Sequence, residues 1–162
     1  MIKNVIQDFK VNSFRSGVIL FFYRLISTIY YKFDNLLGKV LVRLINFIWE
    51  VLKMIMNINC QISYKAQIGS NIRLLHIGEG VIISAKAIIG NDVSIYHQVT
   101  IGINEFLPLN EQKIVIGNNC YISAGAKIIS CVLGDNVKVG PNAVVYRNVN
   151  SNQRVFVQGM IK

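Results

Sequence analysis

Ile116-Gly-Asn-Asn-Cys-Tyr, residues 116–121, is the stretch of sequence that decides the fold, because the same six-residue phrase returns before and after it. Each copy has an aliphatic residue, a Gly or Ser, two polar or small residues, a small apolar residue and a variable one. Other clear copies begin at Ile68, Ile89, Leu133 and Val139. Self-similarity at a short fixed period is typical of a β-solenoid, in which stacked repeats bury a core that no repeat can bury alone.

The order of residue types within the phrase predicts a short strand followed by a corner. The aliphatic residue must point inward, since each repeat has only a few strand residues. The Gly after it permits conformations that a Cβ would disfavour, and the Asn or Asp residues that follow tolerate tight, left-handed corners. The fifth position is a second inward residue at a crowded corner, which explains its small or β-branched side chains: Val93, Val99, Cys120, Ala126, Val137, Ala143 and Val149.

A different pattern precedes the repeats, so we divide the chain into a helical segment, residues 1–57, and a solenoid, residues 58–162. In the first part, apolar residues recur at spacings of three and four, which predicts amphipathic helices with a break near Gly38. The fold class is therefore mainly β, a parallel β-helix preceded by an α-helical segment. The apolar positions of the helical segment are Val18, Phe21, Phe22, Leu25, Ile29, Phe33, Leu36, Val40, Leu44, Ile48, Leu52 and Ile55.

The helical segment has two candidate roles. Eight Lys or Arg residues stand against three acids before Cys60, with aromatic residues near the apolar side, which fits helices at a membrane surface. The alternative is a packing or trimerisation element, because an amphipathic stripe is commonly a core face. Charged residues interrupt every apolar window long enough to span a bilayer, and no signal peptide is recognisable. We therefore expect a cytoplasmic protein, peripheral at the inner face of the plasma membrane if the helices bind lipid.

The composition narrows the classes of ligand. The net charge of +9 is high, but the basic residues are scattered and lack the interleaved aromatic residues of a nucleic-acid groove. We expect an anionic ligand or membrane surface and no nucleic acid. Cys60, Cys120 and Cys131 are odd in number and have no metal-ligand spacing, so we expect small core residues, no disulfide framework and no metal.

The repeat is interrupted twice, and interruptions of a regular scaffold are where function is expected. The first interruption places His76 where the repeat would continue, with Gly78 and Gly80 letting the backbone turn closely around it. The second is residues 103–113, which match no repeat and must leave the solenoid as a loop. His76 is a candidate general base because imidazole titrates near neutrality, whereas His97 lies in a regular copy, where a structural role is the alternative.

Four stretches carry a resemblance to a known family. They are Leu74-Leu-His-Ile-Gly-Glu-Gly-Val-Ile-Ile, Val93-Ser-Ile-Tyr-His-Gln-Val-Thr-Ile-Gly, Ile116-Gly-Asn-Asn-Cys-Tyr-Ile-Ser-Ala-Gly-Ala-Lys-Ile-Ile and Val139-Gly-Pro-Asn-Ala-Val-Val. Residues 62–162 resemble the left-handed β-helix hexapeptide acyltransferases, in their serine acetyltransferase-like or polysaccharide O-acetyltransferase branch. The resemblance implies a left-handed solenoid, a homotrimer and acetyl-CoA bound in the groove between two subunits.

The resemblance also assigns roles to single residues. His76 falls on the family's catalytic histidine, which would act as general base without an acyl-enzyme. Gly102 matches a position where the backbone approaches the acetyl group. Ala124 and Pro141 match small residues along the pantetheine arm of CoA, and Lys162 matches a terminal lysine near its phosphates.

Three departures from the family concern the acceptor. Gln61 replaces the aspartate that orients the catalytic imidazole, and a neutral amide cannot stabilise imidazolium by charge. Leu75 replaces an acidic residue that helps to hold the serine ammonium, and Glu111 takes the place of a loop histidine. Glu79, Glu105 and Glu111 are the nearest carboxylates that could substitute, and we take His97, Glu79 and Glu111 as candidate substrate-binding residues.

These departures, together with the absence of the family's long helical domain, favour an acceptor with a hydroxyl and no essential cation. We therefore expect O-acetylation of a small or lipid-linked saccharide, a precursor of capsule, exopolysaccharide or lipopolysaccharide. The alternatives are serine O-acetylation in cysteine biosynthesis, then N-acetylation of an amino sugar, then a noncatalytic solenoid scaffold.

Overall fold

The structure is a computed structural model and describes residues 2–157. Three helices lead the chain: α1 (Ile2–Val11), α2 (Phe14–Lys32) and α3 (Leu36–Ile55). The strands that follow within residues 2–157 are β1 (Gln61–Ile62), β2 (Gln67–Ile68), β3 (Arg73–Leu74), β4 (Ile82–Ile83), β5 (Ala87–Ile89), β6 (Ser94–Ile95), β7 (Thr100–Gly102), β8 (Ile114–Ile116), β9 (Tyr121–Ile122), β10 (Lys127–Ile129), β11 (Val132–Leu133), β12 (Lys138–Val139), β13 (Val144–Val145) and β14 (Arg154–Val155).

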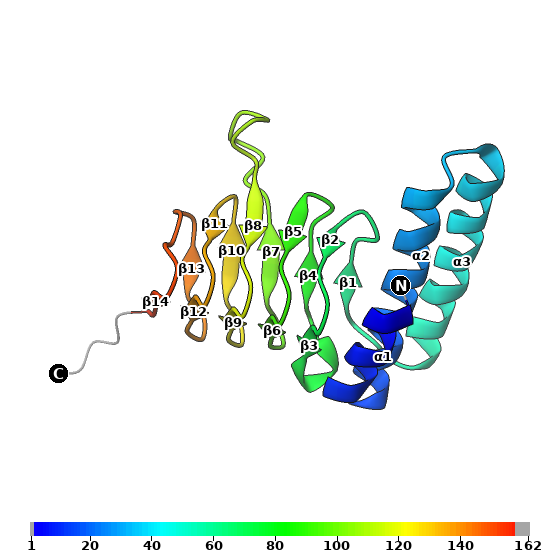
Figure 1. Cartoon of the computed structure of the whole chain (residues 1–162), viewed down its shortest axis with the longest axis horizontal. Coiled ribbons are helices and arrows are strands. Elements are labelled where there is room, and N and C mark those ends of the chain that lie inside the picture. The colour runs from blue at the N-terminus through cyan, green and yellow to red at the C-terminus, as the bar shows by residue number, and fades with distance from the viewer. Residues whose placement is uncertain (1, 158–162) are drawn as a thin grey trace.

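From β1 to β13 each strand pairs in parallel with the third strand after it, and β14 pairs with β12, so the strands form the three sides of a prism (Figure 1). The first side is β1-β4-β7-β10-β13, the second is β2-β5-β8-β11 and the third is β3-β6-β9-β12-β14. The predicted left-handed parallel β-helix with helices before it is confirmed. Residues 103–113 project from it as a loop between β7 and β8, and the helices cover the end at β1 (Figure 1).

The glycines of the repeat are required by the stacking of the coils. A Cβ added to Gly90 would lie 2.8 Å from the carbonyl carbon of Gly117, and one added to Gly117 would lie 2.7 Å from that of Gly134. Such distances are well inside van der Waals contact, so neighbouring coils could not approach as they do. The aliphatic residues before these glycines, Ile89, Ile116 and Leu133, are buried as predicted.

The polar residues of the repeat bond one coil to the next. The side-chain amide of Asn91 donates to Asn118 Oδ1 at 3.2 Å, and that of Asn118 donates to Asp135 Oδ1 at 3.1 Å. The residue after each of them has a positive φ, which Asn and Asp adopt at the least cost after Gly. These left-handed corner residues are Asn71, Asp92, Asn119, Asn136 and Asn152.

The helices differ from the predicted pattern in the position of their breaks. The break between α2 and α3 lies at residues 33–35, not at Gly38, and a further break after Val11 separates α1 from α2. Asn35 caps α3 because its side chain accepts a hydrogen bond from the Gly38 backbone N–H at 2.8 Å, so Gly38 lies in the first turn. Within residues 2–157, none of the helices combines the length and apolar character that crossing a membrane requires.

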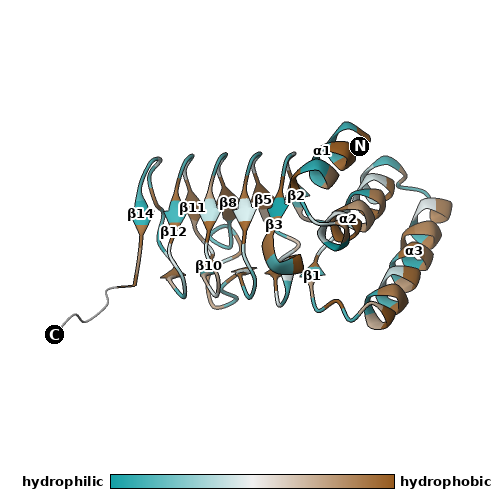
Figure 2. Ribbon diagram, turned by 90° about the horizontal axis from the view of Figure 1, so that it is seen from below, coloured by the Kyte–Doolittle hydropathy of each residue, from teal (hydrophilic) through white to brown (hydrophobic). Residues whose placement is uncertain are grey.

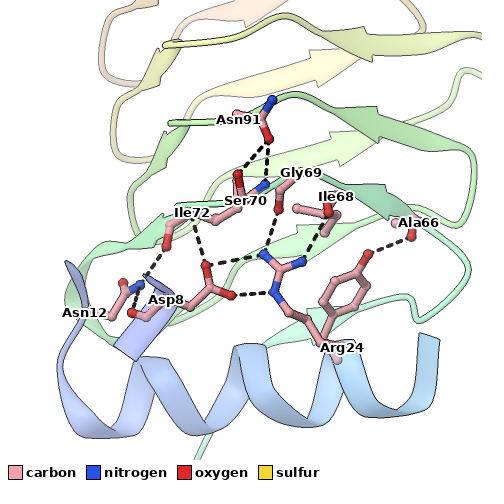
Figure 3. A network of polar contacts seen from close by, with 10 residues as sticks. Asp8, Asn12, Arg24, Ala66, Ile68, Gly69, Ser70, Ile72 and Asn91 are labelled. Carbon is pink, nitrogen blue, oxygen red and sulfur yellow. Dashed lines mark hydrogen bonds and ion pairs between the residues drawn. The ribbon is translucent and has the colours of Figure 1, made fainter. Parts of the chain in front are cut away.

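A buried ion pair joins the helices to the first coil (Figure 3). Arg24 of α2 binds Asp8 of α1, and both side chains are almost completely buried. Arg24 also donates to the Gly69 carbonyl at 2.6 Å, and Asp8 accepts from the Ile72 backbone N–H at 3.2 Å. The pair therefore satisfies backbone groups that the end of the solenoid would otherwise leave without partners.

Candidate active site

His76 lies in a short insertion at the corner between the third and first sides of the prism. The insertion is a 3-10 turn, Leu75–Gly78, and it lengthens the coil: Gln61 pairs with Ile82, 21 residues on, whereas Ile82 pairs with Thr100, 18 residues on. His76 and Ile77 have φ values of 52° and 61°. Positive φ is unfavourable for both residue types, and such strain is concentrated at functional sites. The turn presents the His76 side chain to solvent.

The structure brings His97 against His76. Their ring centroids are 4.9 Å apart and the rings are nearly perpendicular, at 85°. The contact follows from the register, since β3 pairs with β6 and each histidine comes two residues after its strand. The Nδ1 atom of His97 is buried and has no hydrogen-bond partner within residues 2–157. The two imidazoles therefore lie in contact at the same corner of the prism.

Ala124 and Pro141 continue the same corner into the following coils. β6 pairs with β9, and β9 pairs with β12, so the residue two places after each strand stacks on its counterpart. The Gly125 backbone N–H donates to the His97 carbonyl at 3.0 Å, and the Asn142 N–H donates to the Ala124 carbonyl at 2.9 Å. Three of the residues assigned by resemblance thus stand in one row with His97. We call this row the His76 column: His76, His97, Ala124 and Pro141.

Gly102 differs from the glycines of the repeat. It ends β7 and lies beside Ile129 of β10, and a Cβ added to it would meet its nearest neighbours at 3.6 Å, an ordinary contact. Its φ is not positive. The fold of one subunit therefore does not require glycine here.

The other assigned residues are not joined to His76 within the subunit. Gln61 is exposed on β1 and lines a pocket of about 390 Å³ between α3 and the first coils, and it makes no side-chain hydrogen bond to His76 within the described chain. Glu79 is exposed at the end of the His76 insertion. Glu111 lies in the loop at a different corner of the prism (Figure 1). Lys162 lies outside the described residues.

The buried thiol beside the insertion is unsuited to covalent catalysis. A Cβ added to Gly78 would lie 3.5 Å from Cys60 Sγ, so this thiol lies under the His76 turn. Burial raises the pKa of Cys60 to about 12, which keeps it protonated and unreactive at neutral pH. All three cysteines are buried and free, as predicted. Across residues 2–157 no cluster of three metal-ligating side chains is found.

The connection between α1 and α2 also borders His76, although it was not predicted from the sequence. Asn12 and Ser13 line a small pocket with Arg73 and His76. Asn12 is held there because its side chain accepts from the Leu74 backbone N–H at 2.7 Å and donates to the Ile72 carbonyl at 2.6 Å. The six-residue period has no bearing on this segment, and an Asn-Ser pair between helices indicates only a cap.

Comparison with known proteins gives consistent matches. Residues 113–147 match the family described as bacterial transferase hexapeptide (six repeats). The serine acetyltransferase of Buchnera aphidicola subsp. Schizaphis graminum is 32% identical over 160 residues, covering 92% of this chain and 59% of that protein. The serine acetyltransferase of Helicobacter pylori is 42% identical over 82 residues, covering 49% of this chain and 46% of that protein. The chain spans about half the length of the curated relatives that it matches.

Solved structures agree with these relatives. Serine acetyltransferase isoform 3 of Entamoeba histolytica, in complex with cysteine, has a TM-score of 0.72 at 26% identity and covers 93% of this chain and 50% of its own. Soybean serine acetyltransferase complexed with serine has a TM-score of 0.69 at 24% identity, covering 90% of this chain and 56% of its own. The soybean likeness shows the fold alone.

The prediction of a saccharide acceptor was wrong, because the relatives and structural neighbours are serine acetyltransferases. That prediction relied on departures at single positions and on a missing helical domain. The Buchnera alignment covers 92% of the chain, so it extends into the helical segment as well as the solenoid. Part of the chain, residues 113–147, thus matches the bacterial transferase hexapeptide family, and the relatives in sequence and in structure are serine acetyltransferases.

Proposed function

We propose that this protein is an acetyl-CoA-dependent acetyltransferase that acts on the hydroxyl of serine, with His76 as general base. The observation that carries the proposal is the His76 column, in which an exposed imidazole on a strained turn heads a row that continues through His97 to the small side chains of Ala124 and Pro141. A long, thin ligand could lie along such a row with its reactive end at the imidazole. The choice of serine as the acceptor rests on the relatives, which are serine acetyltransferases.

The residues suit a direct transfer. His76 takes the proton of the serine hydroxyl as that oxygen attacks the thioester carbonyl, and it returns the proton to the leaving thiolate of CoA. Cys60 is buried and protonated, so we do not expect an acyl-enzyme to form on that thiol. Gly102 leaves room for the acetyl group, and Ala124 and Pro141 border the pantetheine arm. Lys162 stays assigned to the phosphates by resemblance.

The ammonium of serine needs an anionic partner, which Leu75 cannot supply. Glu79 is the nearest carboxylate along the chain to the base, is exposed, and forms no ion pair within residues 2–157. Glu111 is a second candidate if the protein is a homotrimer. The loop and the His76 column stand at different corners of one subunit, so only a neighbouring subunit can bring them together. Sedimentation equilibrium tests whether the protein is a homotrimer, which would have a mass of three times 18.3 kDa.

The test of the proposal is release of free thiol from acetyl-CoA in the presence of serine. We expect turnover in the wild type and a loss of at least about 100-fold in His76→Ala, the usual contribution of a general base. Gln67→Ala, an exposed change on another side of the prism, serves as the matched control and should keep full activity. Undiminished turnover in His76→Ala would remove His76 from the mechanism, and no thiol release with serine would reject the acceptor.

A further inference from the structure

The third helix, α3, has apolar side chains around most of its circumference, and they divide into two groups. One group packs against the rest of the molecule and contains Val42, Ile45, Trp49 and Leu52. The other is exposed to solvent, and we call it the outer α3 face. It consists of Leu36, Leu37, Val40, Leu41, Leu44, Phe47, Ile48, Val51, Met54 and Ile55.

The outer α3 face is continuous along the helix. Its members recur at spacings of three and four over Leu36–Ile55, so they form one stripe roughly 30 Å long at 1.5 Å per residue. The exposure is large at its centre, where Leu44 is 53% and Phe47 is 67% exposed. Contiguous apolar surface of this size marks a site of interaction, whereas scattered exposed apolar residues do not.

The position of α3 leaves this face free of the solenoid. α2 lies between α3 and the first coil, and α3 forms the outermost element at that end of the molecule (Figure 2). The packing role considered for the helices explains only the buried group. Packing and binding to a membrane surface, which the sequence left as alternatives, can therefore concern different sides of α3.

The charged residues of the helices indicate what kind of partner the outer α3 face would bind. Each of the three acids before Cys60 pairs with a basic residue: Asp8 with Arg24, Asp34 with Lys39 and Glu50 with Lys53. This leaves a group of cations without a carboxylate partner within residues 2–157, namely Lys3, Lys10, Arg15, Lys32 and Arg43. Arg43 is on α3 itself and, at helical spacing, adjoins Val40 and Phe47 at the edge of the outer face.

We infer that the outer α3 face binds the surface of an anionic lipid bilayer. The apolar stripe would enter the boundary between headgroups and acyl chains, with the helix lying along the surface and Arg43 at the lipid phosphates. A second copy of the chain is the weaker occupant, because each helical segment has eight basic and three acidic residues before Cys60, so pairing two of them would bring like net charges together. This inference does not depend on the proposed function.

The test is co-sedimentation of the full chain with vesicles of phosphatidylcholine alone or of phosphatidylcholine with phosphatidylglycerol. We expect binding to the anionic vesicles that weakens as salt rises, and little binding to the neutral ones. The variant Leu44→Glu/Phe47→Glu should bind at least about tenfold more weakly, because it removes two large apolar side chains from the bilayer and adds like charge. Arg43→Glu should weaken binding and reduce its salt dependence.

The matched control is Ile88→Glu/Val144→Glu, which makes the same change at two exposed apolar positions on the solenoid, 43% and 59% exposed. It should leave vesicle binding unchanged, and the melting temperatures of both double variants verify that they are folded. Equal binding by the α3 double variant and the wild type would overturn the inference. So would absence of wild-type binding to anionic vesicles, or a loss of oligomer mass in the α3 double variant, which would show that a second copy covers the face.

Discussion

Two corners of the prism follow opposite rules. At the corner between the second and third sides, each coil repeats a glycine, a side chain that bonds to the next coil and a left-handed Asn or Asp. At the corner between the third and first sides, the first coil places a 3-10 turn with two strained residues, His76 and Ile77. The corner between the second and third sides, which we call the ladder corner, uses residue types suited to their conformations. The His76 corner does not do so in the first coil, at His76 and Ile77.

The difference separates stability from function. Each residue of the ladder corner is explained by the coil above or below it. His76 is exposed and strained, and neighbouring coils do not require it, so its presence at a cost to stability points to chemistry. The same distinction holds for glycine, since Gly117 is required by stacking and Gly102 is not. Substitutions at the two corners should therefore affect different measurements.

The largest effect on stability is expected for Gly117→Ala in the ladder corner. The new Cβ would lie 2.7 Å from backbone atoms of Gly134 and Asp135, and overpacking of that kind costs about 3 kcal/mol. At this chain length such a loss lowers the melting temperature by about 6–12 °C. Thermal unfolding followed by circular dichroism measures it.

Gly102→Ala is the matched control for that substitution, because its nearest contacts are ordinary, at 3.6 Å. We expect an unchanged melting temperature and a loss of acetyl transfer. Equal destabilisation by the two substitutions would show that Gly102 is a stacking glycine after all.

The residues of the ladder corner could be predicted from the sequence because their constraints are local. A period of six, with Gly and Asn at fixed places, specifies strand, corner and inward residue in each coil. Ile2, Val5, Ile6 and Phe9 also have the spacing of an amphipathic helix, so α1 could have been predicted although it was not. Asn35, the N-cap of α3, could also have been predicted, because Asn is a preferred residue at this position.

The His76 corner could be predicted only in part. The interruption of the repeat indicates His76, but its contact with His97 depends on how many residues the insertion adds to the coil. Asp8 and Arg24, 16 residues apart in the chain, form a buried pair that joins α1 to α2, and nothing in either helix's pattern requires it. Asn12 reaches the site through the same docking of helices onto the first coil. These features depend on tertiary geometry rather than on local sequence.

A moderate effect is expected for Asn118→Ala, also in the ladder corner. Its side chain accepts from the Asn91 backbone N–H at 2.9 Å and donates to Asp135 Oδ1 at 3.1 Å. Because these groups are exposed, water replaces part of what is lost, and we expect about 1 kcal/mol of destabilisation by urea unfolding. Acetyl transfer should be unchanged. A large loss of activity without loss of stability would mean that the ladder corner also takes part in the reaction.

The substitution His76→Gly should not lower the stability of the protein, in contrast to the substitutions in the ladder corner. Glycine adopts a φ of 52° without the penalty that histidine bears, although it makes the unfolded chain more flexible. The variant should be as stable as the wild type or up to about 1 kcal/mol more stable, while acetyl transfer is lost. Urea unfolding and thiol release are measured on the same sample. Destabilisation by several kcal/mol would instead show that His76 is a packing residue.

The smallest effect at neutral pH is expected from the thiol beneath the His76 corner. Burial raises the pKa of Cys60 from 9.0 to about 12, so the folded state resists its ionisation. Because the folded pKa is the higher one, the contribution of Cys60 to stability is complete below pH 9 and is lost progressively as the pH rises from 9 to about 12. Cys60→Ala lacks this ionisation, so its unfolding free energy should fall less steeply over that interval. Parallel pH profiles of the two proteins would show that the thiol is already accessible to solvent in the folded state.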